Sequence, residues 1–422
     1  MANIKTIPFS EERIKEIIKA YPTPFHIYDE KAMLEYGEYF INSFAWNKGF
    51  KQFYAIKACP NPYIMKLLKD QGMGIDCSSM AELILAEKVG LRGEDIMFTS
   101  NNTPAEEFKK AAELGAIINL DDIIHIEALE KATGLPELVS FRYNPGALKG
   151  GNIIIGNPED SKYGFTREQL IEGYTILRDK GVKRFGLHTM VASNELDNDY
   201  FVETAEIIFD VIAEVKEKVG IDIEFANLGG GIGIPYKSEH KPVDLEKVSA
   251  GIKAKYDEMI IGKGLKPLKI YFESGRAITG PYGYLVTTVR QIKETYKKYI
   301  GVDATMANLM RPALYGAYHH ITVMGKENEV HDQLYDVAGS LCENNDKFAI
   351  NRLLPKNIVA GDIIIIHDTG AHGHAMGFQY NGKLRSAELL LRGDGSVKEI
   401  RRAETMDDYY ATIDFDGAVD FE

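Results

Sequence analysis

The sequence predicts an (α/β)₈ TIM-like barrel joined to a C-terminal all-β domain. Short runs of β-branched and aromatic residues alternate with segments of helical period over the first two thirds of the chain. We count eight such runs, the number of strands that closes a barrel. The alternation stops near residue 280, and 422 residues are enough for two domains. We therefore expect the barrel over residues 31–280 and the β domain over 1–30 and 281–422.

The expected elements follow from these runs. Barrel strands are predicted at 51–58, 74–78, 96–100, 116–120, 138–143, 184–190, 223–228 and 269–273. Helices are predicted between most of them, as at 79–89, 105–114, 199–218 and 245–263. After residue 280, segments such as 284–294 and 319–325 alternate without long helices, and Gly393-Asp394-Gly395 predicts a hairpin. The strand-like run at 24–28 precedes the first barrel strand, so we expect it to join the β domain.

Charge and cysteine content exclude several classes of partner. The net charge is −13, from 62 acidic and 49 basic residues, which argues against a nucleic acid or an anionic membrane as partner. No apolar run approaches the roughly 18 residues of a membrane span. The N-terminus shows no signal peptide. The three cysteines do not make a disulfide framework, so we expect a cytoplasmic protein.

Three groups at the carboxyl ends of the barrel strands are candidates for chemistry. Lys57 ends the first strand and is a candidate Schiff-base amine; a surface lysine is the ordinary alternative. Glycines 229–231 follow the seventh strand, where backbone N–H groups can bind a phosphate, or where the chain simply turns. Glu273 and Arg276 follow the eighth strand. The carboxylate could keep a pyridine nitrogen protonated and the guanidinium could bind a phosphate or carboxylate, unless the two form a structural pair.

Eight sequence blocks give the chain a resemblance to a known family. In chain order they are YAIKACPNP (54–62), RYNPG (142–146), SKYGF (161–165), NLGGGIGIPY (227–236), ESGRAITG (273–280), RPALYGAYH (311–319), CENNDKF (342–348) and GFQYNGKLRSAE (377–388). With these blocks the chain resembles the fold-type III pyridoxal-phosphate-dependent decarboxylases, whose barrel is similar to that of alanine racemase. Among them it is most similar to the diaminopimelate decarboxylases.

The resemblance implies a cofactor, a reaction and a set of site residues. It implies pyridoxal phosphate, decarboxylation of meso-diaminopimelate to L-lysine in lysine biosynthesis, and a homodimer whose β domain completes the partner's active site. Lys57 and Cys342 would be catalytic, Lys57 as the Schiff-base lysine and Cys342 as a general acid. The cofactor-binding positions, besides Lys57, would be His188, Ser193, Gly230, Gly231, Glu273, Gly275, Arg276 and Tyr380. The substrate-binding positions would be Arg276, Arg311, Tyr315, Glu343 and Tyr380.

Several positions depart from the family pattern and leave alternatives open. Met190 stands where a second His usually stacks on the cofactor ring, and Ala192 replaces the usual Gly before Ser193. The common CESGD is CENND here, and Ala371-His372 replaces the common Ala-Tyr. Glu343 still favours diaminopimelate, because an Asp follows the Cys in the ornithine and arginine branch. The alternatives are a decarboxylase of ornithine, lysine, arginine or carboxynorspermidine, and a catalytically inactive regulatory relative.

A cluster of histidines near the C-terminal end of the sequence is a candidate metal site. It comprises His367, His372 and His374, with Asp368 beside the first. Their spacing fits no common zinc signature such as HExxH. We therefore expect no metal, and expect histidines that line the site or the dimer interface.

Overall fold

The computed structural model describes residues 5–150 and 156–415 of the chain. Among these, residues 32–235 and 239–278 form one compact unit, and residues 5–31, 236–238 and 279–415 form a second. Residues 1–4 and 416–422, which belong to the predicted β domain, lie outside the described residues.

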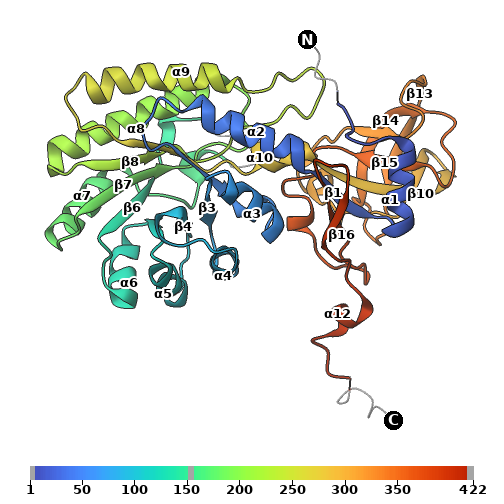
Figure 1. The fold of residues 1–422 in the computed structure, drawn as a ribbon, viewed down its shortest axis with the longest axis horizontal. Coiled ribbons are helices and arrows are strands. Elements are labelled where there is room, and N and C mark those ends of the chain that lie inside the picture. The colour runs from blue at the N-terminus through green and yellow to red at the C-terminus, as the bar shows by residue number, and fades with distance from the viewer. Residues whose placement is uncertain (1–4, 151–155, 416–422) are drawn as a thin grey trace. The chain divides into compact units, whose positions relative to one another are not determined.

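The first unit is a closed barrel of parallel strands, which confirms the predicted fold class (Figure 1). Each strand pairs with the next in the chain, and β9 returns to β2 through Tyr271 beside Lys51 and Phe272 beside Gln52. The strands are β2 (Lys51–Ala55), β3 (Gly74–Cys77), β4 (Ile96–Thr99), β5 (Ile117–Leu120), β6 (Leu138–Tyr143), β7 (Arg184–Thr189), β8 (Ile223–Asn227) and β9 (Lys269–Phe272). Each of the eight lies within its predicted range. Because the strands are parallel, every carboxyl end lies at one mouth of the barrel.

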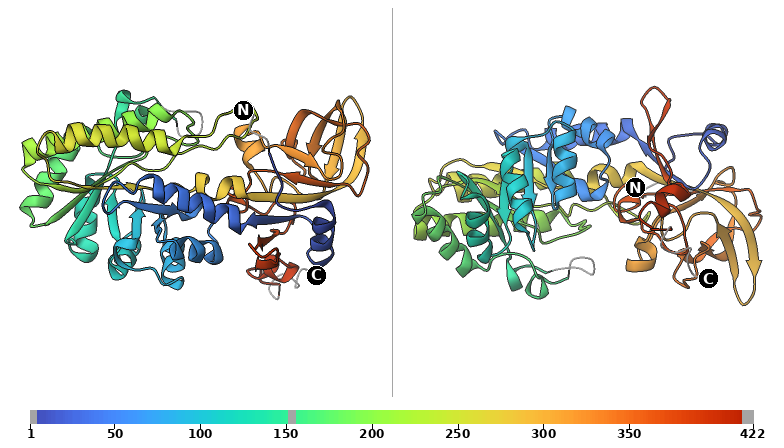
Figure 2. Two further views of the ribbon diagram at one scale, coloured as in Figure 1. Left: turned by 45° about the horizontal axis from the view of Figure 1, so that its top comes forward. Right: turned by 90° about the horizontal axis from the view of Figure 1, so that it is seen from below.

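Helices between the strands surround this barrel, and α8 and α9 lie side by side along it (Figures 1 and 2). Local signals set their limits: Thr166 and Gln169 form a capping box before α7, and α5 ends at Gly115 with φ 70°. The helices are α2 (Glu30–Ser43), α3 (Pro62–Asp70), α4 (Met80–Lys88), α5 (Ala105–Leu114), α6 (Ile124–Thr133), α7 (Arg167–Asp179), α8 (Asn198–Val219), α9 (Leu245–Tyr256) and the short α10 (Arg276–Thr279) after β9.

The two ends of the barrel differ in chemistry. Apolar side chains fill the interior, with Phe53, Phe225 and Tyr271 in ring contact. Where β8 begins, Glu224 pairs with Arg184 and Lys269 on the neighbouring strands. Ionisable groups at this end therefore pair with one another, as expected of the end that stabilises such a barrel, and the carboxyl ends are left for function.

The second unit is built around a mixed sheet in the order β14-β13-β11-β10-β1-β16-β17, with β15 on β10 and β12 on β15. β1 pairs with β10 and β16, so the run predicted at 24–28 does join this sheet, and β16 and β17 form the predicted hairpin. The strands are β1 (Phe25–Asp29), β10 (Gly283–Glu294), β11 (Lys298–Val302), β12 (Ile321–Val323), β13 (His331–Ala338), β14 (Lys347–Pro355), β15 (Ile363–Ile366), β16 (Ala387–Leu391) and β17 (Val397–Arg401).

Three helices accompany this sheet: α1 (Glu11–Ala20), α11 (Arg311–Tyr315) and α12 (Met406–Tyr410). Helix α1 was not predicted from the sequence. The Ser10 side chain caps it by accepting from the Arg13 N–H, and Ile14 and Ile17 are buried in the apolar core of the sheet. In the part of the chain that the structure describes, no helix is both long and apolar enough to cross a membrane.

Candidate active site

Lys57 lies at the carboxyl mouth of the barrel, close to a buried carboxylate. β2 ends at Ala55, and the chain continues in a 3₁₀ turn, Ile56–Ala58, so the strand is shorter than the predicted 51–58. The Lys57 Nζ is 3.9 Å from Oδ2 of Asp76 on β3. The Lys57 side chain is 52% exposed whereas that of Asp76 is 2% exposed. The lysine thus keeps access to solvent while its amine stays near a buried acid.

Glu273, directly after β9, is buried and held by two side chains from neighbouring strands. Its Oε2 lies 2.8 Å from Nε2 of His188, and its Oε1 accepts a 2.7 Å hydrogen bond from Nδ2 of Asn227. Burial raises the pKa of Glu273, but the His188 contact, the charge of Lys57 and the Asn227 bond outweigh it, so the pKa is lowered. Glu273 is therefore ionised at neutral pH, as a partner for a protonated ring nitrogen must be.

His188 thus contacts Glu273, whereas the resemblance implied a contact with the cofactor. Because a carboxylate only accepts hydrogen bonds, the His188 Nε2 donates. Its Nδ1 is buried and has no hydrogen-bond partner among the described residues. The histidine therefore orients the carboxylate with one nitrogen and leaves the other available.

Asp76 is a second buried carboxyl at this mouth, and it is not among the predicted site residues. Burial and the nearby charge of Glu273 raise the pKa of Asp76 well above its ordinary value, against the opposing charge of Lys57. Its Oδ1 accepts no hydrogen bond from any described residue. The pKa values of Asp76 and Glu273 are thus pushed in opposite directions, the pattern expected when one carboxyl holds a proton and the other is ionised. Its place at the end of a predicted strand was the available signal.

Glycines expose backbone without side chains at the same mouth of the barrel. A Cβ on Gly230 would lie 2.5 Å from the carbonyl oxygen of Glu273, and one on Gly231, where φ is 87°, would lie 2.5 Å from that of Ala192. A Cβ on Gly275 would lie 2.9 Å from the Ala58 Cβ. Side chains are therefore excluded at these three predicted cofactor positions, and backbone N–H groups can approach a ligand closely.

Met190, Ser193 and Arg276 lie next to this glycine loop. The Gly230 N–H donates to Sδ of Met190 at 3.2 Å, so the residue that replaces the usual histidine contacts the loop backbone. The buried Arg276 side chain donates from Nη2 to Oγ of Ser193 at 3.5 Å. The structure thus brings together two more of the predicted cofactor residues.

These residues fit pyridoxal phosphate. A lysine amine suits its aldehyde, an ionised buried carboxylate suits a protonated pyridine nitrogen, and bare glycine backbone beside an arginine suits its phosphate. The unpartnered Oδ1 of Asp76 and Nδ1 of His188, stated for the described residues, are buried polar groups that a polar ligand could satisfy.

Five predicted residues belong to the second unit, and Arg311 and Tyr315 are the first two. They begin and end the short helix α11. The buried Arg311 donates from Nη1 to the Tyr236 hydroxyl at 2.7 Å and to Nε2 of His319 at 2.9 Å. The opposite nitrogen of His319, Nδ1, donates to the carbonyl oxygen of His367 at 2.8 Å. These contacts fix the orientation of the guanidinium, whereas Tyr315 is partly exposed.

Cys342, Glu343 and Tyr380 lie on exposed turns of the second unit. The Cys342 N–H donates to Oδ1 of Asn381 at 2.7 Å, which links Cys342 to the residue next to Tyr380. The Glu343 carboxylate accepts from the Asn345 N–H at 3.0 Å. Asn381 was missed by the sequence analysis, because a contact over 39 residues leaves no local pattern.

The late histidine cluster is divided among different partners. The His367 Nε2 lies 2.8 Å from the Thr322 Oγ1, and the His374 Nε2 lies 3.0 Å from the carbonyl oxygen of Ser386. Asp368 accepts from the Lys5 Nζ at 2.8 Å. Within residues 5–150 and 156–415, no group of three or more His, Cys, Asp or Glu side chains is arranged to hold a metal ion.

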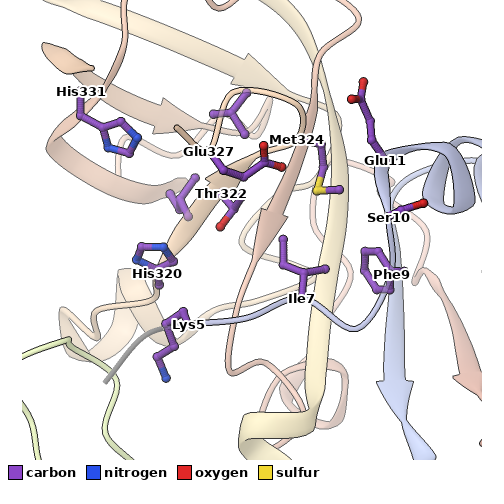
Figure 3. A pocket seen from close by; sticks show the side chains of 12 residues that line it. Lys5, Ile7, Phe9, Ser10, Glu11, His320, Thr322, Met324, Glu327 and His331 are labelled. Atoms are coloured by element: carbon purple, nitrogen blue, oxygen red, sulfur yellow. The ribbon is translucent and has the colours of Figure 1, made fainter. Parts of the chain in front are cut away.

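A cavity of about 400 Å³ lies elsewhere in the second unit, between the N-terminal segment and β12 (Figure 3). Its lining includes Lys5, Phe9, His320 and Met324, and none of the predicted site residues. Lys5 is already paired with Asp368. The cavity is therefore no part of the candidate site.

Known proteins are similar to this chain in both sequence and fold. A model of the family described as pyridoxal-dependent decarboxylase, pyridoxal binding domain, matches residues 40–280. Protein TabA of Pseudomonas amygdali pv. tabaci is 44% identical over 400 residues, covering 95% of this chain and 93% of the relative. Diaminopimelate decarboxylase of Methanothermobacter thermautotrophicus is 36% identical over 396 residues, covering 93% and 92%.

Solved structures of diaminopimelate decarboxylases are similar to this chain over nearly its whole length. Diaminopimelate decarboxylase from M. jannaschii in co-complex with L-lysine matches with a TM-score of 0.87 and 30% identity, covering 94% of each chain. The Helicobacter pylori enzyme complexed with L-lysine matches with a TM-score of 0.86 and 28% identity, covering 94% of this chain and 98% of that one. The chain thus belongs to the pyridoxal-dependent decarboxylases, carboxy-lyases that use pyridoxal phosphate, and is similar within that family to the diaminopimelate decarboxylases.

Proposed function

We propose that this chain decarboxylates meso-diaminopimelate to L-lysine, as a cytoplasmic homodimer whose two subunits share their active sites. The observation that supports this substrate is the environment of Arg311, a buried arginine whose guanidinium is oriented by Tyr236 and His319. A planar guanidinium in a fixed direction suits a carboxylate, which it can bind through two parallel hydrogen bonds. Meso-diaminopimelate carries a second carboxylate at its distal end, and lysine and ornithine do not.

The barrel residues would hold the cofactor. Lys57 would attach it covalently through Nζ, the N–H groups around Gly230, Gly231 and Gly275 would bind its phosphate together with Arg276, and Glu273 would keep its ring nitrogen protonated. When bound, pyridoxal phosphate supplies the electron sink that lets the α-carboxylate leave as CO₂.

Two side chains of this protein would hold and transfer protons during the reaction. Asp76, whose pKa is raised by burial, can hold a proton 3.9 Å from the Lys57 Nζ and exchange it with that amine. The Cys342 thiol would return a proton to the α-carbon after CO₂ has left, because an exposed thiol can act as a general acid. His188 would hold the Glu273 carboxylate in place throughout.

The second unit would bind the distal end of the substrate. Arg311 would bind the distal carboxylate, with Arg276 as a second cation and the hydroxyls of Tyr315 and Tyr380 as donors. The Glu343 carboxylate would pair with the distal ammonium. A substrate that lacked the distal carboxylate would forgo a hydrogen bond to a charged group, at a cost of about 1.5–3 kcal/mol.

The experiment compares specificity constants for meso-diaminopimelate, L-lysine and L-ornithine. We expect meso-diaminopimelate to be preferred over lysine by about tenfold to hundredfold, from that cost and 1.36 kcal/mol per factor of ten. Arg311→Gln should reduce kcat/KM for meso-diaminopimelate and leave the rate with lysine almost unchanged. Arg13→Gln, which removes an exposed ion pair with Glu16 in the same unit, is the matched control and should leave the preference intact. Equal use of lysine or ornithine by the wild-type enzyme would refute this substrate.

A second candidate is decarboxylation of another diamino acid or of a carboxy-polyamine such as carboxynorspermidine. The departures at Met190 and His372 favour it, and the 44% identity to TabA, whose name states no substrate, leaves it open. Adding arginine and carboxynorspermidine to the same substrate panel decides between the two candidates.

The assembly and location are proposals on the same basis. Among the described residues, Cys59, Cys77 and Cys342 form no disulfide, which suits a reducing compartment. Exposed Cys342 and Glu343 would be used most simply by a partner subunit, as the family resemblance implies.

A further inference from the structure

A tight turn carries Tyr380 in the second unit. The Lys383 N–H donates to the carbonyl oxygen of Tyr380 at 3.1 Å, which closes a four-residue turn. The two central residues, Asn381 and Gly382, have φ of 51° and 66°. Positive φ at both central positions is the pattern of a type I′ turn, for which Asn-Gly is the preferred pair. The backbone conformation of the turn therefore explains why a small residue that tolerates positive φ stands at 381.

The side chain of Asn381 makes a hydrogen bond that the turn does not require. Its Oδ1 accepts the Cys342 N–H at 2.7 Å, across 39 residues of sequence. An Asn in a type I′ turn can leave its side chain in solvent, because the turn is closed by backbone atoms alone. The contact therefore serves the segment that carries Cys342.

That segment is anchored from the inside by a different residue. The buried Asp346 accepts the Leu341 N–H through Oδ2 at 2.8 Å and the Met306 N–H through Oδ1 at 2.6 Å. Its own N–H donates to the carbonyl oxygen of Glu343 at 3.0 Å. Asp346 thus fixes the base of the loop, and Asn381 contacts its exposed tip, where Cys342 and Glu343 lie.

We propose that Asn381 is a positioning residue, whose side-chain carbonyl fixes the backbone of Cys342 so that the Cys342 thiol and Tyr380 are presented together. This rests on the proposed role of Cys342 as the proton donor. A proton donor must lie within hydrogen-bond reach of the reacting carbon, and an exposed loop loses that precision unless something restrains it. One hydrogen bond from the residue next to Tyr380 ties the two groups to a single rigid turn.

Two substitutions separate this role from a role in the turn alone. Asn381→Gly keeps the turn, because glycine adopts positive φ without steric cost, but it removes the acceptor. Asn381→Asp keeps an oxygen acceptor and still tolerates positive φ. A residue needed only for the turn would be replaced equally well by both variants.

The first measurement is amide hydrogen exchange of the segment 340–346, read by mass spectrometry on the whole enzyme. In Asn381→Gly we expect the Cys342 amide to exchange about five- to tenfold faster, the factor expected for one lost hydrogen bond, and the Asp346-bound Leu341 amide to be unchanged. Asn381→Asp should retain the wild-type rate at Cys342. An unchanged Cys342 rate in Asn381→Gly would overturn the proposal.

The second measurement is turnover with whichever diamino acid of the panel the wild-type enzyme uses, in H₂O and in D₂O. We expect Asn381→Gly to lower kcat about five- to tenfold with KM within about twofold, and to enlarge the solvent isotope effect on kcat, because proton return becomes slower. Asn381→Asp should restore both values. Faster exchange at Cys342 with unchanged kcat and isotope effect would overturn the positioning role.

Cys342→Ala tests the proposed function separately. We expect it to lose turnover in the same direction as Asn381→Gly and by a larger factor. Full turnover by Cys342→Ala would overturn the proton-donor role and the positioning role with it, even where the exchange data still showed the hydrogen bond. A missing hydrogen bond between Asn381 and Cys342 and a Cys342 thiol that donates no proton therefore give different results.

Discussion

Replacing Glu273 by Gln is the sharpest test of the barrel site. The carboxylate is buried, accepts from Asn227 at 2.7 Å and lies 2.8 Å from the His188 nitrogen. Gln has nearly the same shape and can still accept from Asn227 through its carbonyl oxygen. Its NH₂ can donate to the His188 Nε2 once the imidazole proton has moved to Nδ1, so the main loss is the negative charge. The barrel should therefore stay folded, and the change should act on the cofactor ring nitrogen.

The size of the effect follows from the lost charge. A hydrogen bond to a charged group is worth about 1.5–3 kcal/mol, and a neutral bond about 0.5–1.5 kcal/mol, so the bond to the ring nitrogen loses about 1–1.5 kcal/mol. Loss of the ring proton adds an effect of about 10²-fold or more, the usual contribution of a correctly held catalytic proton. We therefore expect kcat to fall by about 10²-fold or more and KM to change by less than about threefold, because the proton matters mainly in the transition state.

The assay is CO₂ release under saturating substrate, with cofactor content measured by absorbance for each protein. Glu224→Gln is the matched control, because Glu224 lies at the opposite end of the adjacent strand and pairs with Arg184 and Lys269. It should lower thermal stability and leave kcat within about twofold. A Glu273→Gln enzyme with full cofactor content and an unchanged kcat would refute the assignment of Glu273 to the ring nitrogen.

Three further predictions test other parts of the account. Lys57→Ala should abolish covalent cofactor attachment without unfolding the chain; borohydride reduction and mass spectrometry check this, and a modified lysine elsewhere would contradict it. Mixing inactive Lys57→Ala and Cys342→Ala proteins should restore activity through heterodimers with one intact shared site, and no recovery despite demonstrated subunit exchange would argue against shared sites. The pKa of Glu388 is lowered to about 2, because His374 and Arg401 outweigh the opposing effect of burial. A folded pKa below the ordinary 4.5 contributes stability that is present above pH 4.5 and is lost as pH falls toward 2, about 3 kcal/mol in all. Glu388→Gln should therefore flatten this part of the pH profile of unfolding, and an unaltered profile would show that the ion-pair network is weak.

The sequence predicted the barrel well because its signals are local. Each parallel strand is a short β-branched run, and helical period separates one run from the next. The exact strand end was harder to predict: 51–58 ends in a 3₁₀ turn at Ile56–Ala58, because Ile-Lys-Ala suits either conformation. The helix Glu11–Ala20 was missed, although its Ser10 cap and buried Ile14 and Ile17 carry the usual signals.

The sequence predicts which residues gather at one mouth of the barrel, but not which of them pair with one another. That Lys57, His188 and Glu273 share one mouth follows from barrel topology. The contact of His188 with Glu273, over 85 residues of sequence, depends on which rotamers fit between strands. The expected cofactor contact of His188 came from the resemblance and stays a prediction. The raised pKa of Asp76 depends on burial, which no local pattern of residues reports.

The two units place different constraints on what the enzyme recognises. In the first unit, Glu273 and its neighbours lie at the ends of strands that pair with one another, and side chains are excluded at Gly230, so the cofactor residues change little without damage to the barrel. In the second unit, Cys342 and Glu343 lie on an exposed loop whose tip is held to Asn381 by a side-chain contact. Under the proposed function, substitutions in that loop would alter the recognised amine or carboxylate at little cost in stability, since surface changes usually cost less than about 0.5 kcal/mol. Under the proposed function, the CENND segment is therefore a sharper guide to the substrate than any residue of the barrel.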